Sequence, residues 1–518
     1  MKKWVKGEIS RKSFKEFPML TNSTKEDGKA RTGRRRHSAV FLIMLALATA
    51  GLVGCAVGPD FERPKTPDVA HYTTGPALTQ TSSSPAQFGN GQRLVEGLPI
   101  EVQWWRELGS IKLDSLIDEA LQASPTLAAA DANLRQAQAL ASAHAGSTQY
   151  PQVDAGLGAQ RQQTNPNSQG ASGDARQFNL YGATVNVRYR LDLAGGNQRT
   201  LEALTARADY RHFELHAARL ALAGNLATTA ISYGRISAQM DAIAALVDAQ
   251  DEQVQLTQTR VRIGQASLDE VLSLQAQAEQ TRAELSVLAR QQQQTGHLLS
   301  VLAGRAPGAD GIPSFTLADF SLPAELPVIV PSELVRRRPD IQAAESLLHA
   351  ANAEYGAAVA RLYPRLDLST SLGSQALSMG ALFGSGSAIW NLAGQLIQPL
   401  FNPGLSAEKR AALAAFDAAT ANYQTVVLES LRNVADTLRA VENDARVVAD
   451  LASADSAAQA FLQSIERQYR LGTASYLQLL IAQQQIQKIR INLVAAQAQR
   501  LADSVALYQA MGGGFQAS

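Results

Sequence analysis

The chain has 518 residues, with 6% aromatic and 18% charged residues and many Ala, Gln and Leu residues, a composition typical of long packed helices rather than of an enzyme. Its formal net charge of +1 conceals an asymmetry, because the first 54 residues carry 12 Lys and Arg against 4 Asp and Glu. The rest holds 35 basic and 42 acidic residues. This balance leaves no basic face for nucleic acid and excludes that class of partner.

Residues 1–54 are predicted to be a signal peptide. A basic stretch that ends at Arg36 precedes an apolar run over 39–50, and Leu52-Val53-Gly54-Cys55 follows. This order is typical of a secretory signal that ends in a lipobox, so Cys55 is expected to be lipidated and to become the first residue. An uncleaved anchor is the alternative, but the apolar run is short for a span of ~20 residues. Met19 is an alternative start for this signal.

Cys55 is the single cysteine of the sequence, so no disulfide is expected in the mature chain. The next residue is Ala56 and not the Asp associated with inner-membrane retention, which favours the outer membrane. One lipid group gives only modest anchoring, so a second membrane attachment is expected. Residues 55–100 are rich in Pro, Ser, Thr, Gly and Gln and are predicted to form an extended, lipidated tether.

Residues 101–304 are predicted to begin with two helices. Apolar residues recur at helical spacing over 110–123. Ser124 and Pro125 then provide an N-cap and a first-turn proline for a helix that ends near Thr148, before Pro151. The period changes to two over 153–160 and 180–191, where apolar and polar residues alternate. A two-faced β-hairpin is therefore predicted over about 152–192.

Very long helices are predicted to follow. Residues 198–260 contain no proline, and Gly264 interrupts the pattern before a helix that returns over 267–302. Residues 305–330 form a Pro-rich connector. Residues 331–512 repeat the plan, with a hairpin over about 365–399, a proline-free stretch over 404–470, a turn near Gly472 and a helix over 475–510. Residues 513–518 form a tail.

Residues 116–304 and 330–512 are interpreted as two copies of one unit. Arg262-Ile263-Gly264 and Ser267 recur at an offset of 208 as Arg470-Leu471-Gly472 and Ser475, and Ala303-Gly304 recurs as Met511-Gly512. Tyr150-Pro151 recurs as Tyr363-Pro364 at an offset of 213. A period near two hundred residues is too long for a solenoid and indicates a duplicated subdomain.

Two strands per copy give four strands in each chain. Four strands cannot close a barrel, and an open sheet edge is not tolerated in lipid. Three chains would supply twelve strands, so the predicted fold is mainly α with a trimeric, twelve-stranded transmembrane β-barrel continued by a long α-helical barrel. A soluble helical protein with two incidental hairpins is the alternative.

The sequence resembles the outer-membrane factor family of tripartite efflux systems, TolC-like channels of the NodT lipoprotein type. Four segments carry the resemblance and together span nearly all of the mature chain. They are Cys55 to Pro64, Trp104-Trp105 with Leu116-Ile117 and Ala120-Leu121, Leu326 to Ile341 with Ala344-Glu345, and Arg467 to Gly472 with Tyr476-Leu477, Leu479-Leu480 and Ala482-Gln483. The Arg338-Pro339-Asp340-Ile341 segment is the most specific of these.

The resemblance implies a homotrimer in outer-membrane lipid whose helical barrel extends into the periplasm. It implies a passive exit duct that is docked by a periplasmic adaptor protein and an inner-membrane transporter of the RND type. Efflux of drugs and other small molecules is the leading functional hypothesis. A type I protein secretion channel is one alternative, and a non-channel envelope coiled-coil lipoprotein is another.

The resemblance also places Gly264 and Gly472 in turns at the periplasmic tip, where the tube is closed. Glu270 lies where relatives often carry a pore-facing acidic residue, whereas its counterpart here is Gln478. Tyr469 matches a position used in closing interactions, and Arg262 and Arg470 are candidate partners for pore carboxylates. A solvated helix-turn surface is the alternative for each of these candidate gate residues.

No catalytic residue, cofactor or metal is expected. His212 and His216 are four residues apart, but the sequence between them lacks the Glu placement of a zinc-protease helix and no third ligand is evident. Gly195-Gly196 lacks the spacing of a nucleotide-binding loop and is expected to turn the chain from strand to helix.

Overall fold

The computed structural model describes residues 56–73, 78–165, 170 and 173–514. The predicted signal peptide and Cys55 lie outside these residues. Within the part of the chain that is described, no helix is both long enough and apolar enough to cross a membrane.

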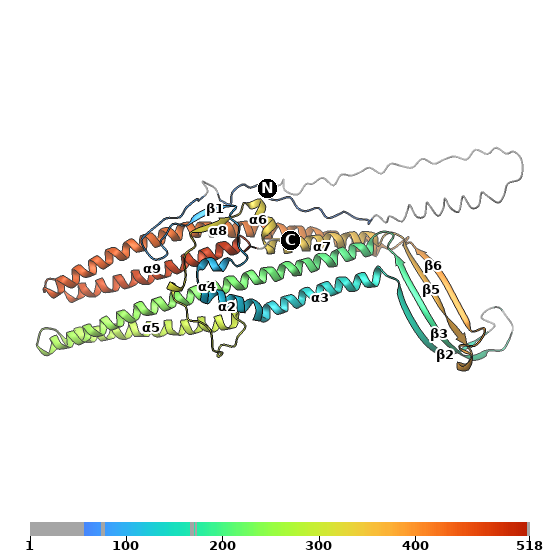
Figure 1. The fold of residues 1–518 in the computed structure, drawn as a ribbon, viewed down its shortest axis with the longest axis horizontal. Coiled ribbons are helices and arrows are strands. Elements are labelled where there is room, and N and C mark those ends of the chain that lie inside the picture. Colours follow the sequence, from blue (N-terminus) through green and yellow to red (C-terminus); the bar gives the residue numbers. More distant parts are fainter. Residues whose placement is uncertain (1–55, 74–77, 166–169, 171–172, 515–518) are drawn as a thin grey trace. The chain divides into compact units, whose positions relative to one another are not determined.

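The first repeat has a 3-10 helix, two shorter α-helices, a hairpin and two long helices (Figure 1). These elements are the 3-10 helix η1 (Trp104–Leu108), α2 (Ile111–Ala123), α3 (Pro125–Thr148), β2 (Gln152–Thr164), β3 (Arg176–Leu191), α4 (Gly196–Arg262) and α5 (Leu268–Leu302). Ser110 caps α2 by accepting a hydrogen bond from the Leu113 N–H, and Pro125 occupies the first turn of α3 as predicted. The 67 residues of α4 extend roughly 100 Å at ~1.5 Å per residue.

The second repeat has the same order of elements. They are α6 (Pro331–Arg337), α7 (Pro339–Ala360), β5 (Arg365–Ala376), η4 (Met379–Ala381), β6 (Ala388–Ile397), α8 (Pro403–Arg470) and α9 (Tyr476–Ala510). Asn402 caps α8 by accepting the Gly404 N–H at 3.0 Å. In both repeats two shorter helices precede a hairpin, and two long helices follow it.

The helices of the two repeats form one layer. Next to the sheet, α3 packs on α4, α4 on α7 and α7 on α8; farther along, α5 packs on α4 and α9 packs on both α4 and α8 (Figure 1). Gly304 after α5 approaches the Ala123 carbonyl before α3, and Arg338 before α7 donates to the Ala510 carbonyl at the end of α9 at 3.0 Å. The shorter helices α3 and α5 therefore lie end to end beside the long helix α4. In the same way, α7 and α9 lie end to end beside α8.

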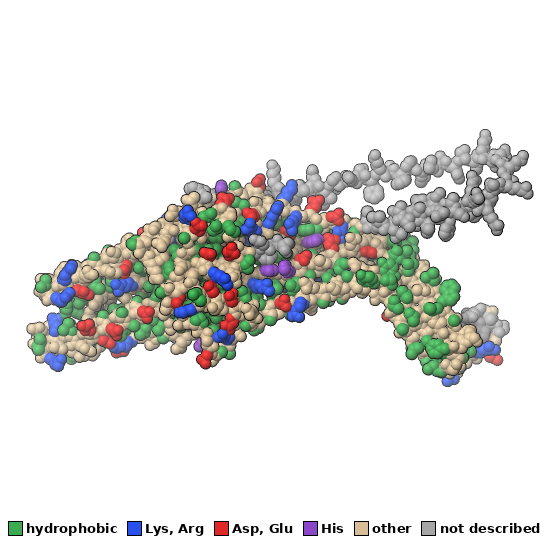
Figure 2. Space-filling view, in the orientation of Figure 1, with side chains coloured by type: hydrophobic (Ala, Val, Ile, Leu, Met, Phe, Trp, Pro, Cys, Tyr) green, Lys and Arg blue, Asp and Glu red, His purple; other side chains and the backbone are tan. Residues whose placement is uncertain are grey.

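The sheet has the antiparallel order β2-β3-β5-β6. Its register places Val153 opposite Val187, and Val185 opposite Leu372, which lies opposite Trp390, so one face is apolar across all four strands. Apolar side chains cover much of the strand region in Figure 2. The other face carries the ion pairs of Arg188 with Asp154 and of Arg190 with Asp367, each at 2.6 Å. The predicted two-faced strands are confirmed.

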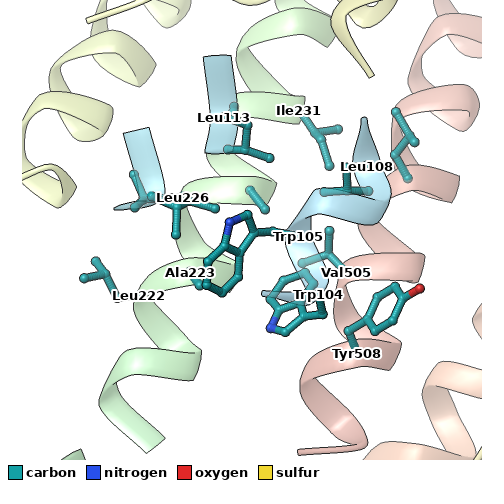
Figure 3. Packing of buried hydrophobic residues seen from close by; sticks show 14 of the residues in the cluster. Trp104, Trp105, Leu108, Leu113, Leu222, Ala223, Leu226, Ile231, Val505 and Tyr508 are labelled. Atoms are coloured by element: carbon teal, nitrogen blue, oxygen red, sulfur yellow. The ribbon is translucent and has the colours of Figure 1, made fainter. Parts of the chain in front are cut away.

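The largest hydrophobic core lies near the middle of α4, where η1 and α2 pack against α4 and α9 (Figure 3). Trp104 is 1% exposed and stacks on Tyr508 of α9 with ring centroids 5.4 Å apart. Leu226 and Ile231 of α4 are also almost fully buried in this cluster. The core fastens the first repeat to the last helix of the second.

The structure adds a strand pair to the segments predicted as tether and connector. β1 (Arg93–Glu96) pairs in parallel with β4 (Glu325–Val328), and η3 (Leu317–Asp319) precedes β4. The fully buried Arg500 of α9 donates to the carbonyls of Phe88 and Asn90 at 2.6 and 2.7 Å. Residues 78–100 are therefore packed on the helices, because contacts from more than two hundred residues away hold them there.

Candidate functional site

The end of each long helical hairpin forms a tight turn built on one glycine. Gly264 has a φ of +80° and Gly472 a φ of +75°, a left-handed backbone that favours glycine. Gln265 N–H donates to the Arg260 carbonyl at 2.8 Å, and Thr473 N–H donates to the Gln468 carbonyl at 2.9 Å. These bonds satisfy the last carbonyls of α4 and α8 and end the helices, as predicted.

A serine starts each returning helix. The Ser267 hydroxyl accepts the Glu270 N–H at 3.3 Å, and the Ser475 hydroxyl accepts the Gln478 N–H at the same distance. At the second turn the Gln478 side chain also accepts the Ser475 N–H at 2.7 Å and completes a capping box. The residues six positions after each glycine therefore lie in the first turn of α5 and α9.

Each hairpin has its own ion pair between the outgoing and returning helices. Arg282 of α5 pairs with Asp251 of α4. In the second repeat Arg490 of α9 pairs with Asp455 of α8 at 3.4 Å, and Arg490 is the counterpart of Arg282 at the offset of 208. Pairs of this exposure contribute about 0–1 kcal/mol each. They hold the arms of one hairpin together but do not join the two hairpins.

Two polar contacts join the hairpins near their tips. Arg260 Nη1 of α4 donates to the Tyr469 hydroxyl of α8 at 2.5 Å. The Tyr476 hydroxyl of α9 donates to Gln253 Oε1 of α4 at 3.3 Å. The Tyr469 and Tyr476 rings meet edge to face, with centroids 6.2 Å apart. The two tyrosines thus form a small aromatic cluster against α4.

The predicted gate residues lie in this region but do not all meet. Tyr469 is half-buried and contacts the other repeat. Burial raises the pKa of Tyr476 to about 12, and Tyr469 and Glu270 shift this pKa in the same direction. Arg262 donates to the Thr259 hydroxyl at 2.9 Å and Arg470 to the Glu466 carbonyl at 3.4 Å, both local bonds. Their pairing with pore carboxylates stays a prediction.

The sequence reasoning missed Arg260, Gln253 and Tyr476. A comparison of the two copies at the offset of 208 could have pointed to two of them, because the paired residues differ in type. Arg260 corresponds to Gln468, and Tyr476 corresponds to Leu268. These contacts use residues that are not repeated. The contacts between the copies therefore lie where the two sequences differ.

The histidines on α4 do not form a metal site with their neighbours. His212 and His216 lie with ring centroids 4.6 Å apart, and burial lowers the pKa of His216 to about 4. Among residues 56–73, 78–165, 170 and 173–514, no group of three or more His, Cys, Asp or Glu residues could hold a metal ion.

The two repeats each match the model of one family, described as outer membrane efflux protein, over residues 116–305 and 330–513. These segments cover most of the chain and coincide with the duplicated unit seen in the fold. The chain belongs to the outer membrane efflux protein family. The predicted membership, the duplicated and mainly helical fold, and the outer-membrane location are confirmed.

Individual family members match over almost the full length. The toluene efflux pump outer membrane protein TtgC of Pseudomonas putida is 31% identical over 92% of this chain and 96% of its own length. The pyoverdine export outer membrane protein OpmQ of Pseudomonas aeruginosa is 30% identical over 80% of this chain and 88% of its own.

Solved channels have the same fold. The outer-membrane channel OprN is 27% identical, with a TM-score of 0.79 over 89% of this chain and 99% of its own. The open state of the Neisseria gonorrhoeae MtrE outer-membrane channel is 25% identical, with a TM-score of 0.76 over 89% of this chain and 98% of its own. The family role of these proteins is transport through the outer membrane.

Proposed function

We propose that this protein is the outer-membrane channel subunit of a tripartite efflux pump, a passive exit duct for drugs and other small molecules and not an enzyme. The observation that carries the proposal is the four-stranded sheet with one apolar face, joined directly to helices of roughly 100 Å. An apolar face of this kind suits lipid, and the opposite face, with its ion pairs, suits water. The helices then extend the water-filled path into the periplasm.

Three copies complete the barrel in this proposal. In the single chain β2 and β6 are the sheet edges, each with one paired side. Lipid cannot satisfy the backbone groups of a free edge, so β6 of one copy pairs with β2 of the next. Threefold symmetry closes a ring of twelve strands, and α3 and α8, the outer helices of the layer, meet between copies in the same way.

Lipidation of Cys55 adds a second membrane attachment. Val57 N–H donates to the Ala194 carbonyl at 3.0 Å, and Ala56 lies against Gly195, in the turn from β3 to α4. The buried Arg199 holds the same segment by an ion pair with Asp60 at 2.6 Å. An acyl chain on the preceding Cys55 would therefore enter the membrane beside the helical end of the sheet.

The tip of the helices is the gate in this mechanism. The Arg260–Tyr469 and Gln253–Tyr476 contacts hold the two hairpins of each chain together and close the aperture. Their separation would move one hairpin relative to the other and widen it. Three copies give three such pairs, so a small energy per contact biases a two-state opening.

The adaptor docks on the tip turns. Ile263 and Leu268 at the first turn are 64% and 62% exposed, and Leu471 and Leu477 at the second are 79% and 62% exposed. Each turn thus presents two exposed apolar side chains, of which Ile263 and Leu471 are counterparts in the repeat. A trimer has six such turns, a repeated surface for adaptor hairpins. An inner-membrane transporter, of the RND type, supplies the energy and selects the cargo.

The relatives named for efflux of toluene and export of pyoverdine favour small-molecule cargo over secreted proteins. The test is deletion of the gene and measurement of the accumulation of a fluorescent amphipathic dye in cells. We expect accumulation to rise and to return to normal when the chain is restored. Loss of one secreted protein with unchanged dye accumulation would instead favour type I secretion, and no change in either would favour a scaffold.

A further inference from the structure

The two edge strands of the sheet, β2 and β6, correspond in the repeat to two strands that pair with each other inside the chain. β2 recurs as β5 at an offset of 213, the offset of the Tyr-Pro pairs that precede these strands. Gln152 starts the pairing of β2 and lies opposite Arg188 of β3. Its counterpart Arg365 starts the pairing of β5 and lies opposite Ile397 of β6. β3 therefore recurs as β6, at an offset of 209.

The pairing of β3 with β5 shows how the two edge strands can meet between copies. The register of β3 and β5 is continuous over 11 residue pairs, and one of these pairs is Val187 opposite Thr370. At the two offsets, Val187 corresponds to Leu396 of β6, and Thr370 corresponds to Leu157 of β2. The repeat thus predicts that β6 of one copy lies beside β2 of the next copy, with Leu396 opposite Leu157.

The side chains on the apolar face fit this register. Leu157 is 84% exposed and Leu396 is 65% exposed in the single chain, each on the apolar face of an edge strand. Residues directly opposite each other on one face of an antiparallel pair are in contact, so the two leucines would cover each other. A slip of two residues keeps the faces but would put Leu157 opposite Gly394 or Gln398 instead.

The polar face fits the same register. It sets Gly156 of β2 opposite Ile397 of the neighbouring β6, and Gly158 opposite Gln395. A Cβ atom added at either glycine would meet no other atom within 4 Å. The polar face of β2 therefore has open space that admits the larger side chains of β6.

We propose that β6 of one copy pairs with β2 of the next copy in the register that sets Leu396 opposite Leu157. The inference rests on the proposed trimer. Paired residues then lead across the four strands from Gln152 to Gln160 of the next copy, a stagger of eight residues per copy. Stagger and strand number together determine the tilt and the diameter of a closed barrel, so this register sets the width of the exit duct.

The test is disulfide cross-linking in isolated outer membranes that contain the full chain. Each variant carries Leu396→Cys together with Ala155→Cys, Leu157→Cys or Ala159→Cys, three positions on the same face of β2. The membranes are oxidised with copper phenanthroline, and the products are separated on a denaturing, non-reducing gel. Within one chain β3 and β5 separate β2 from β6, by about 14 Å at ~4.8 Å per strand. A disulfide cannot span this distance, so every cross-link joins two copies.

Val187→Cys with Thr370→Cys is the matched control, because this pair holds the same place in the register inside one chain. It should form a disulfide within the chain, detected as protection of both thiols from alkylation. The unsubstituted chain should give no cross-link. Ile397→Cys with Gly156→Cys tests the same register from the polar face, should Leu396→Cys impair assembly.

We expect the variant with Leu157→Cys to cross-link about tenfold faster than the other two, because its partner lies directly opposite and theirs lies on the diagonal. Equal or faster cross-linking with Ala155→Cys or Ala159→Cys would overturn the register and leave the trimer in place. Absence of cross-links between copies in every variant, with the control disulfide formed, would overturn the proposed trimer and the register with it.

Discussion

Arg260 and Tyr469 join the two helical hairpins of the chain at their tips. Arg260 Nη1 donates to the Tyr469 hydroxyl at 2.5 Å, and the guanidinium carbon lies 5.8 Å from the centroid of the tyrosine ring. Arg260 Nη2 also donates to the Gln265 carbonyl at 3.3 Å. One side chain of the first repeat thus holds its own turn and the outgoing helix of the second repeat.

Removal of this contact should open the tip. A hydrogen bond from a charged donor contributes about 1.5 kcal/mol, so Tyr469→Phe should shift the closed–open ratio by roughly tenfold in each chain. Arg260→Ala should shift it further, because the cation and its bond to Gln265 are lost as well. We expect cells that express either variant to become sensitive to a large hydrophilic antibiotic that the outer membrane normally excludes.

Arg262→Ala is the matched control for this prediction, since Arg262 lies two residues away and bonds to Thr259 on its own helix. It should leave antibiotic sensitivity unchanged. Equal sensitisation by Arg262→Ala and Arg260→Ala would show that tip charge in general, and not the Tyr469 contact, holds the aperture.

The core around Trp104 should decide whether η1 and α2 pack stably against α4 and α9. Trp104 is 1% exposed and stacks on Tyr508, so Trp104→Ala leaves a cavity and should cost about 3–5 kcal/mol. We expect a marked fall in the apparent Tm of the detergent-solubilised protein. Leu400→Ala, at a position that is 93% exposed after β6, should leave the Tm unchanged.

Stability should fall as the pH rises through neutrality, because a buried carboxyl on α9 lies beside a half-buried carboxyl on α8. Asp503 is 4% exposed, and burial, together with a hydrogen bond shared with Asp444, raises the pKa of its carboxyl to about 7. The charge of Arg500 on the same helix lowers this pKa. Its guanidinium, however, donates to the Phe88 and Asn90 carbonyls in the segment before β1.

The pKa of Asp503 is higher in the folded state than in the unfolded state, so the folded protein favours the protonated carboxyl. The resulting contribution to the free energy of unfolding is complete below pH 4 and is lost as the pH rises through 7. The difference in the free energy of unfolding between pH 5.5 and pH 8.5 should be roughly 2 kcal/mol, measured as a lower apparent Tm at the higher pH. Asp503→Asn should reduce this dependence, whereas the exposed Asp450→Asn on α8 should retain it. A dependence that survives in Asp503→Asn would assign it to other groups.

Replacement of Cys55 should remove the lipid but not the barrel. In Cys55→Ala the mass of the mature chain should lack the acyl groups, and signal cleavage at this site should be impaired. We expect less trimer in the outer membrane, because one membrane attachment is lost. Some trimer should remain, because the sheet still supplies a membrane-embedded surface. An unmodified Cys55 in the mass spectrum of the purified wild-type chain would contradict the assignment of the lipobox.

The elements that follow from local pattern were predictable from the sequence. The alternation over Tyr181 to Leu191 predicted the two faces of β3. Gly264 and Gly472 marked the turns, because the backbone there is left-handed and glycine adopts that conformation without strain. The parallel pairing of Leu94 with Leu326 was not predictable, since the two residues are far apart in the chain and each segment alone is rich in turn residues.

The candidate site shows the same division. Tyr469 was found because its segment resembles a family motif. Arg260 and Gln253 were missed, because their importance arises from single side-chain contacts with Tyr469 of α8 and Tyr476 of α9, which no local hydrophobic period records. Arg262, chosen for its place in the repeated motif, bonds locally instead.

The central claim, a trimeric duct closed at the helical tip, is tested most directly by single-channel conductance of the purified protein in planar bilayers. We predict small, uniform openings for the wild type and a stepwise, several-fold larger conductance for the variant with both Arg260→Ala and Tyr476→Phe, which lacks both contacts between the hairpins. The same conductance in the two forms would contradict the assigned gate. No conductance in either form would contradict the channel itself.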